Sequence, residues 1–249
     1  MTEIGILSVA LTQKCNLTCR HCLRGEARNS VIKDETIYKI FSQINKLNML
    51  LLTGGEVFLH PEKIITVSEA IIKNQTKIKR ISIVANGTIW NEKTKEALRC
   101  LKSVSQPDVA ISSDLFHKEE LKRLKLHDFS NEIVEFCKEN KIEYTFSDLR
   151  KNTLVMRGRA KTLNESNIPH PENQPKKKYK LLYAPPYSKE KSMKALTHPL
   201  DFFRYAEVNI DGAVGGSGEE WEYYDNPDNI LFNVNDMTFE EYIKSQEQS

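Results

Sequence analysis

Excess charge of one sign, a long hydrophobic run and a disulfide framework are all missing from this 249-residue sequence. Its 36 lysines and arginines nearly balance 34 aspartates and glutamates, so no overall electrostatic attraction to nucleic acid or to a membrane surface is expected. The longest apolar stretch, around residues 49–52, is too short to cross a bilayer, and the N-terminus lacks the basic flank of an export signal. Five cysteines are an odd number, which fits disulfide pairing poorly and favours a reducing compartment. We therefore expect a cytoplasmic protein that has neither nucleic acid nor a membrane as a partner.

The chain alternates between two hydrophobic patterns. Hydrophobic (39%) and charged (28%) residues occur in ordinary globular proportions, which excludes a disordered, collagenous or solenoid chain. Short runs rich in isoleucine, valine and leucine alternate with segments whose apolar residues recur every three or four positions. This alternation predicts strands at 4–12, 49–53, 80–85, 108–112 and 142–146, and helices at 34–47, 61–74, 92–104, 118–126 and 129–140, with Asp34 as the first N-cap. Five consecutive strand–helix units predict a parallel sheet with right-handed crossovers, at a length that suits one α/β barrel.

Regular patterning weakens after Leu163 and then returns. Residues 164–200 contain six prolines and the basic run 176–180, which indicates either a solvated loop or a mobile cover or docking surface for an acidic substrate. A sixth strand at 202–210, a turn at Asp211-Gly212 and a helix at 238–245 are expected beyond it. The sequence thus predicts a barrel core at 1–163, an irregular loop at 164–200 and a short α+β extension at 201–249.

Three of the five cysteines, Cys15, Cys19 and Cys22, lie in one loop directly after the first predicted strand, with the spacing C-x3-C-x2-C. Loops at the carboxyl ends of strands carry the chemistry of α/β barrels, and three thiolates can converge on a soft metal or an iron–sulfur cluster. A structural zinc site would need a fourth ligand, and the chain contains no second C-x2-C. A four-iron cluster held by three cysteines would leave one iron open to bind a small molecule. Cys100 and Cys137 stand alone on predicted helices and are expected in the core.

Taken with Gly54-Gly55-Glu56 after the second strand, the cysteine loop resembles the radical S-adenosylmethionine (radical SAM) superfamily. The resemblance implies a partial (β/α)6 TIM-like barrel, one [4Fe–4S] cluster held by the three cysteines, and S-adenosyl-L-methionine at its open iron. In the family the Gly-Gly-Glu turn receives the methionyl amino group, which suits glycines that let backbone carbonyls approach and a carboxylate that attracts an ammonium. His21, just before the third cysteine, occupies a position where the family usually carries an aromatic residue near the adenine.

Weaker matches follow the later strands. Asn86, in an Asn-Gly-Thr turn, and Ser112, in Ser-Ser-Asp, resemble family turns in which the former shapes the nucleoside side of the site and the latter bonds the ribose. The same analogy makes Asp114, which would line the substrate cavity, and the nearby His117 candidate catalytic groups. Arg159 lies in a Gly-Arg-Ala sequence that resembles the peptide-modifying branch, where it would help to hold a carboxylate. The alternatives are ordinary loop-closing chemistry for the turns and a surface position for His117.

The C-terminal segment resembles one branch of the superfamily but lacks some of that branch's cysteines. Residues 208–214, Val-Asn-Ile-Asp-Gly-Ala-Val, resemble the start of a SPASM-type extension, the C-terminal addition of many peptide-modifying radical enzymes. No cysteine lies beyond Cys137, so auxiliary clusters of that extension are not expected. The sequence therefore supports a single cluster.

The resemblance implies reductive cleavage of S-adenosylmethionine to a 5′-deoxyadenosyl radical, under anaerobic conditions and with electrons from an external donor such as flavodoxin or ferredoxin. Three hypotheses follow. The first is an oxidoreductase that modifies a ribosomally made peptide or protein by cross-linking, epimerisation or another C–H change. The second is an enzyme that acts on a small metabolite such as a nucleotide or a cofactor precursor, which the basic run 176–180 would suit. The third is a non-catalytic binding scaffold.

Overall fold

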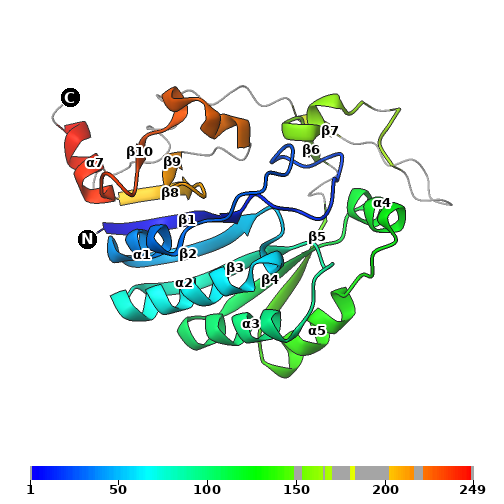
Figure 1. Cartoon of the computed structure of the whole chain (residues 1–249), viewed down its shortest axis with the longest axis horizontal. Helices are drawn as coiled ribbons and strands as arrows, with labels where there is room; N and C mark the ends of the chain where they lie inside the picture. The colour runs from blue at the N-terminus through cyan, green and yellow to red at the C-terminus, as the bar shows by residue number, and fades with distance from the viewer. Residues whose placement is uncertain are drawn as a thin grey trace.

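One eight-stranded sheet organises the protein. A computed structural model describes residues 2–148, 153–164, 166–169, 180–182, 202–215 and 221–247 (Figure 1). The sheet has the order β10-β9-β8-β1-β2-β3-β4-β5, in which the strands from β8 to β5 run parallel and β9 pairs antiparallel with both β8 and β10. Its strands are β1 (Thr2–Thr12), β2 (Ile44–Gly54), β3 (Lys77–Ala85), β4 (Pro107–Ser112), β5 (Glu143–Ser147), β8 (Phe202–Val208), β9 (Ala213–Gly215) and β10 (Phe232–Asn233).

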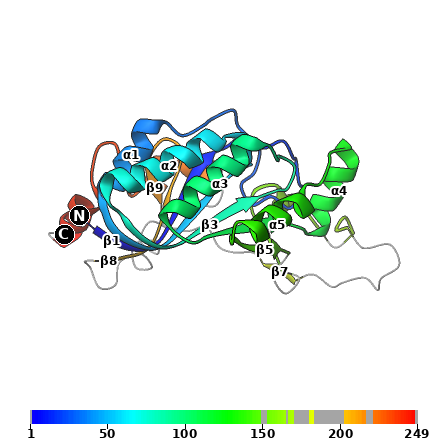
Figure 2. The same ribbon diagram turned by 90° about the horizontal axis from the view of Figure 1, so that it is seen from below.

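Helices alternate with the parallel strands and cover the sheet. They are α1 (Asp34–Ser42), α2 (Pro61–Asn74), α3 (Glu92–Val104), α4 (Leu115–Leu124), α5 (Ser130–Glu139) and α7 (Phe239–Glu247). Figures 1 and 2 show α1, α2 and α3 side by side along one face of the sheet. This arrangement of parallel strands and outer helices, followed by antiparallel strands, confirms the predicted partial barrel with a C-terminal α+β extension.

The first predicted helix was too long. The structure ends α1 at Ser42 and begins β2 at Ile44, so Ile44 and Leu47 are buried strand residues. Their spacing continues the helical repeat of the preceding apolar residues. Periodicity alone therefore cannot distinguish one more helical turn from the first residues of the next strand. Asp34 is the first helical residue rather than the N-cap, and its carboxylate accepts a 2.7 Å hydrogen bond from Lys63.

The sixth parallel strand, β8, lies on the far side of β1 from β5. Val9 of β1 pairs with Leu52 of β2 and with Val208 of β8, which makes β1 central in the sheet. The carboxyl end of β8 is therefore next to the cysteine loop that follows β1. This pairing brings the C-terminal extension to the predicted site.

A second, two-stranded parallel sheet joins β6 (Thr153–Val155) to β7 (Lys180–Leu182). Neither strand was predicted. Lys180 belongs to the basic run at 176–180, of which the rest lies outside the described residues, as does most of the predicted loop 164–200.

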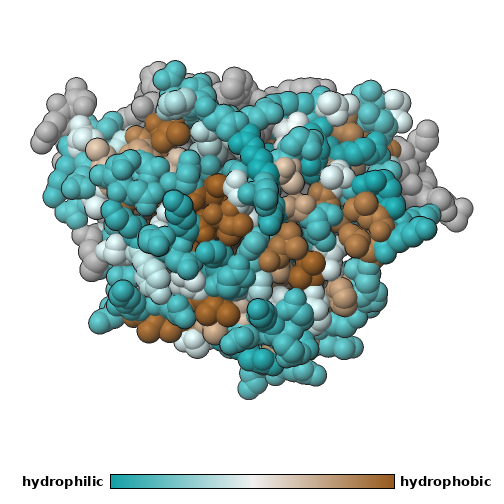
Figure 3. Space-filling view, viewed as in Figure 1, coloured by the Kyte–Doolittle hydropathy of each residue, from teal (hydrophilic) through white to brown (hydrophobic). Residues whose placement is uncertain are grey.

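The main core fills the space between the sheet and its helices. Cys137 is buried there as predicted, whereas Cys100 is only half-buried. The face in Figure 3 is mainly hydrophilic, with hydrophobic patches separated by hydrophilic side chains. Within the described ranges, no helix combines the length and apolar character that spanning a membrane requires.

Candidate functional site

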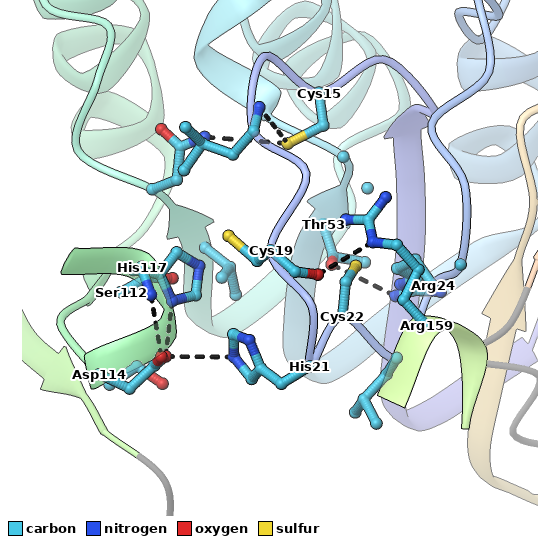
Figure 4. Close-up of a pocket in the computed structure, with 18 of the residues that line it drawn as sticks. Cys15, Cys19, His21, Cys22, Arg24, Thr53, Ser112, Asp114, His117 and Arg159 are labelled. Atoms are coloured by element: carbon cyan, nitrogen blue, oxygen red, sulfur yellow. Dashed lines mark hydrogen bonds and ion pairs between the residues drawn. The ribbon is translucent and has the colours of Figure 1, made fainter. Parts of the chain in front are cut away.

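A cavity of about 380 Å³ opens at the carboxyl ends of the parallel strands (Figure 4). Loops after β1, β2, β3, β4 and β5 contribute to its wall, together with β6 and residues near 159 and 221. All three cysteines of the first loop, Cys15, Cys19 and Cys22, line it, and all three are free thiols. Loops that follow parallel strands meet at one edge of a sheet, which explains why motifs far apart in sequence share this cavity.

Helix α4 holds the cysteine loop in place. Leu17 and Cys19 are buried against Leu121 of that helix. The backbone N–H of Thr18 donates a 2.9 Å hydrogen bond to the carboxylate of Glu120, which is 5% exposed. The loop is therefore fixed between its first and second cysteines by both apolar packing and a buried acceptor.

The cysteine thiols lie in a poorly solvated setting. Burial raises the pKa of Cys15 to about 11, and burial together with the neighbouring thiols raises the pKa of Cys19 further. Without a bound cation these thiols stay protonated at neutral pH. A coordinating metal deprotonates its thiol ligands, so three free thiols at one cavity, Cys19 buried and the other two half-buried, form a donor set suited to a metal centre.

The Gly-Gly-Glu turn packs directly on the cysteine loop. Gly54 has φ +150°, and a Cβ there would lie 2.2 Å from the Thr12 carbonyl oxygen. A Cβ on Gly55 would lie 1.9 Å from the Lys14 carbonyl oxygen. Both glycines also line the cavity. The absence of a side chain at both positions thus lets the two loops touch, and it leaves the backbone of the turn facing the cavity.

The carboxylate of Glu56 joins two turns. It is 1% exposed and accepts hydrogen bonds from the backbone N–H groups of Phe58, at 2.9 Å, and Asn86, at 2.6 Å. Burial raises the pKa of Glu56 to about 7, although these two bonds oppose the shift. Glu56 is not among the residues that line the cavity, so its observed contacts are with backbone and not with open space.

Asn86 and Ser112 both line the cavity. The Asn86 amide donates a 3.0 Å hydrogen bond to the Asn16 side chain and lies 3.9 Å from the Cys15 sulfur. Its carbonyl oxygen accepts from Thr88. The turn after β3 is thereby fixed beside the first cysteine.

Two imidazoles share one carboxylate on the opposite wall. Asp114 caps α4 by accepting from the backbone of Phe116 and His117, and its carboxylate also contacts the His117 ring at 2.5 Å and the His21 ring at 3.3 Å. Burial would raise the pKa of Asp114, but hydrogen bonds from both rings outweigh it and hold that pKa well below its ordinary value. His21 stacks on Phe116 with ring centroids 4.5 Å apart.

This imidazole–carboxylate group brings together three predicted residues, and His117 lies in the cavity wall instead of on the helix surface. Ligand atoms of His21, Asp114 and His117 lie within 4.8 Å of one another. Each ring already has a partner in the shared carboxylate. The arrangement is suited to holding or moving a proton at the ring nitrogens.

Arg159 reaches the cavity from a short 3-10 turn, η3 (Gly158–Thr162). Its Nε donates a 2.9 Å hydrogen bond to the Cys19 carbonyl, and its Nη1, 3.6 Å from the Glu26 carboxylate, has no hydrogen-bond partner. Gly158 has φ +52°, and a Cβ there would come within 2.5 Å of the Cys22 carbonyl oxygen. The Gly-Arg sequence is therefore needed for close packing on the cysteine loop.

Sequence reasoning missed a second arginine in the wall. Arg24 pairs with the buried carboxylate of Glu207 in β8 and donates a 3.3 Å hydrogen bond to Thr53. Its guanidinium lies 4.9 Å from the centre of the Trp221 ring. Trp221, in the 3-10 turn η4 (Trp221–Asp225), is 1% exposed and lines the cavity. A glutamate within the predicted sixth strand was the available signal, but its partner depends on β8 pairing with β1.

Comparison with known proteins agrees with this geometry. The family model described as Radical SAM superfamily matches residues 9–156, more than half of the chain. The bacteriocin subtilosin biosynthesis protein AlbA of Bacillus subtilis is 31% identical over 114 residues, covering 44% of this chain and 24% of AlbA. A GTP 3′,8-cyclase of Clostridium perfringens is 28% identical over 165 residues, covering 62% of this chain and 47% of the cyclase. The chain thus spans less than half the length of these curated relatives.

Two solved structures share the fold. Native anSMEcpe with bound AdoMet and Cp18Cys peptide superposes with a TM-score of 0.57 at 17% identity, covering 97% of this chain and 80% of that one. Streptococcus suis SuiB bound to the precursor peptide SuiA gives 0.52 at 14% identity, covering 94% and 63%. At these identities the likeness concerns the fold alone.

Proposed function

Because the chain belongs to the Radical SAM superfamily, whose cofactors are a [4Fe–4S] cluster and S-adenosylmethionine, we propose that it abstracts hydrogen from a peptide or protein substrate. Convergence of the three thiols of Cys15, Cys19 and Cys22 on one cavity, beside the Gly-Gly-Glu turn, is the observation that carries the proposal. In the described part of the chain no fourth cysteine lines that cavity. Three soft ligands and a neighbouring ligand-sized space fit a cluster with one open iron.

When bound, the cluster supplies one electron that cleaves S-adenosylmethionine into methionine and a 5′-deoxyadenosyl radical, which abstracts hydrogen from the substrate. The chain's own residues bind and orient these groups. Arg159, in the cavity wall, is proposed to contact the methionyl carboxylate, and the half-buried backbone of Gly54 and Gly55, which lines the same cavity, to receive the methionyl amine. Glu56 acts on this turn indirectly, by fixing its backbone to the turn that carries Asn86.

The nucleoside half of the ligand is assigned to the opposite wall. Asn86 and Ser112 are proposed to contact the nucleoside and its ribose, and the ring of His21 the adenine. Asp114 keeps that ring and His117 in fixed orientations, which leaves His117 to hold or donate a proton toward the substrate.

Support for a peptide substrate comes from the Gly158-Arg159-Ala160 sequence, which resembles the peptide-modifying branch, and from the C-terminal extension, which contributes Trp221 to the cavity wall. Two of the similar proteins, anSMEcpe and SuiB, were solved with peptides, and AlbA acts in bacteriocin biosynthesis. A nucleotide is the second candidate, because the GTP 3′,8-cyclases match a larger share of this chain than AlbA does.

Anaerobically reconstituted protein tests the proposal. With dithionite and S-adenosylmethionine it should release 5′-deoxyadenosine, and a precursor peptide encoded beside its gene should stimulate that release and change in mass. GTP serves as the competing substrate. Stimulation by GTP with no change in the peptide would reverse the order of the two candidates, and no cleavage of S-adenosylmethionine under any condition would leave only a binding scaffold.

A further inference from the structure

The outer side of α4 carries an unneutralised basic stripe. Lys118, Lys122 and Lys125 are exposed and recur at intervals of four and three residues, which places them along one side of the helix. Across the described ranges, none of these three lysines takes part in an ion pair. Leu126, 38% exposed, continues the stripe at its carboxyl end. Figures 1 and 2 show α4 projecting at the edge of the molecule.

Acidic groups on the same helix do not offset these lysines. Glu119 pairs with Arg20 through a 2.8 Å contact, on another side of the helix. Glu120 is buried and accepts from Arg123 at 2.7 Å and 2.9 Å. Both carboxylates are thus neutralised locally, and the stripe keeps its positive charge.

Apolar packing leads from this stripe to the cysteine sulfurs. Leu121 is buried against Leu17 and Cys19, while the half-buried Leu124 and Cys15 pack on the same group. The backbone N–H of Leu126 donates a 3.0 Å hydrogen bond to the Leu121 carbonyl, which connects the exposed end of the stripe to this packing. A redox protein seated on α4 would therefore be separated from the cysteine loop by the helix and by the apolar side chains that pack on Cys15 and Cys19.

We propose that the basic stripe formed by Lys118, Lys122, Lys125 and Leu126 is the docking surface for an acidic one-electron carrier protein of the flavodoxin or ferredoxin class. The inference rests on the proposed function, because only a bound cluster needs such a partner. Each encounter oxidises the carrier by one electron and reduces the cluster by one, and no covalent bond forms or breaks. Opposite charges steer the encounter, and the exposed leucine supplies a small apolar contact.

An acidic substrate is the competing occupant of this surface. The cavity that would receive a substrate is bounded by the ends of β4 and β5 and by β6, whereas the lysines lie on the side of α4 that is not part of its wall. The position of these charges, outside the cavity wall, therefore favours docking of an electron carrier over binding of a substrate. Binding of an acidic substrate at this surface is the alternative outcome of the experiment below.

Charge reversal at all three lysines, Lys118→Glu with Lys122→Glu and Lys125→Glu, tests the surface. A matched control reverses three exposed basic residues at the amino end of β3, Lys77→Glu, Lys79→Glu and Arg80→Glu, which changes net charge equally. A third variant, with glutamine at the three α4 positions, separates loss of charge from reversal. Far-UV circular dichroism confirms that each protein is folded.

Binding is measured by calorimetry with a purified flavodoxin as the probe, on both apoprotein and reconstituted protein. We expect the α4 reversal to weaken binding at low salt about tenfold or more, the glutamine variant to lie between, and the β3 control to match the wild type. Wild-type binding should weaken as salt rises, since the charges are exposed. Carbodiimide cross-links between flavodoxin carboxylates and protein lysines should map to Lys118, Lys122 or Lys125.

Reduction of the cluster provides the second readout. Reduced flavodoxin should generate the EPR signal of the reduced cluster about tenfold more slowly in the α4 reversal, while excess dithionite reaches the same final signal in every variant. Equal flavodoxin binding and reduction in the α4 reversal and the β3 control would overturn the docking site, as would weakened binding of an acidic substrate with unchanged reduction. Failure of dithionite to produce any signal in the wild type would instead refute the proposed function.

Discussion

The backbone N–H of Asn86 donates a 2.6 Å hydrogen bond to the buried carboxylate of Glu56. This single contact fastens the turn after β3 to the turn after β2. The same carboxylate accepts from Phe58, so both of its oxygens are occupied by backbone donors. Glu56 therefore belongs to the support of the cavity wall, and its ionisation is linked to folding.

Replacing Glu56 by glutamine should change how stability depends on pH. Burial raises the pKa of Glu56 from 4.5 to about 7, so the folded state favours the protonated carboxyl. Its contribution to the free energy of unfolding is fully present below about pH 4.5 and is lost as the pH rises through about 7. Between about pH 5 and about pH 8 the wild type should lose up to about 3 kcal/mol relative to Glu56→Gln.

Urea unfolding of the apoprotein at the two pH values measures this difference. Glu143→Gln, at an exposed position in β5, is the control and should follow the wild type at both. Parallel pH dependence of the wild type and Glu56→Gln would show that the buried carboxyl does not titrate in this range.

The clamp between α4 and the cysteine loop gives a second prediction. Glu120→Gln replaces a buried carboxylate that accepts from Thr18 and Arg123, so one of these donors loses its charged acceptor. We expect a loss of about 1–3 kcal/mol in the free energy of unfolding. Glu119→Gln, which breaks only a half-exposed pair with Arg20, should cost less than about 1 kcal/mol.

Acid should remove the same clamp. Hydrogen bonding to Arg123, the largest effect, lowers the pKa of Glu120 to about 2, so the stabilisation is present above the ordinary pKa of 4.5 and is lost as the pH falls toward about 2. Thermal unfolding of Glu120→Gln should accordingly approach that of the wild type in acid. A constant difference between the two proteins across this range would contradict an ionised clamp.

Alanine substitutions at two glycines with positive φ, Gly158 and Gly25, should distinguish the cost of backbone strain from the cost of steric contact. Gly158 and Gly25 have φ values of +52° and +89°, but an added Cβ lies 2.5 Å from the Cys22 carbonyl in the first case and 3.9 Å from its nearest neighbour in the second. Gly158→Ala should therefore reduce stability by more than Gly25→Ala, which carries only the backbone cost of about 1–3 kcal/mol. Gly158→Ala should also reduce iron uptake, because the carbonyl that its Cβ would displace belongs to Cys22 of the cysteine loop.

Thermal unfolding and iron content of the two variants check this prediction. Equal stability and equal iron content would mean that contact between η3 and the cysteine loop is not required to form the site.

Motifs at strand ends could be predicted from the sequence for a simple geometric reason. Parallel strands end at one edge of a sheet, so residues that follow successive parallel strands are expected at one site. The structure places Cys15, Gly54, Asn86 and Ser112 in one cavity wall. Helices α2 and α3 were predicted with the bounds that the structure has, because Pro61 begins the first and the Asn91 side chain caps the second.

Features that depend on pairing between distant segments could not be predicted in this way. Arg24 and Glu207 meet only because β8 lies beside β1, and no periodic pattern specifies a strand's neighbour. Glu56 has the residue type expected of a ligand, but the orientation of its side chain is set by two backbone N–H donors, those of Phe58 and Asn86, on different turns. The early start of β2 at Ile44 depends on burial in the sheet, which overrides the helical spacing.

Metal content after anaerobic reconstitution tests the central claim, that Cys15, Cys19 and Cys22 hold one [4Fe–4S] cluster. Iron, sulfide and the EPR spectrum after reduction should be compared among the wild type, the three single alanine variants and Cys100→Ala, a half-buried cysteine on α3. We predict about four irons per chain in the wild type and in Cys100→Ala. Each of the three loop variants should lose the four-iron centre and its EPR signal. Retention of a wild-type centre in any one of them would contradict the account.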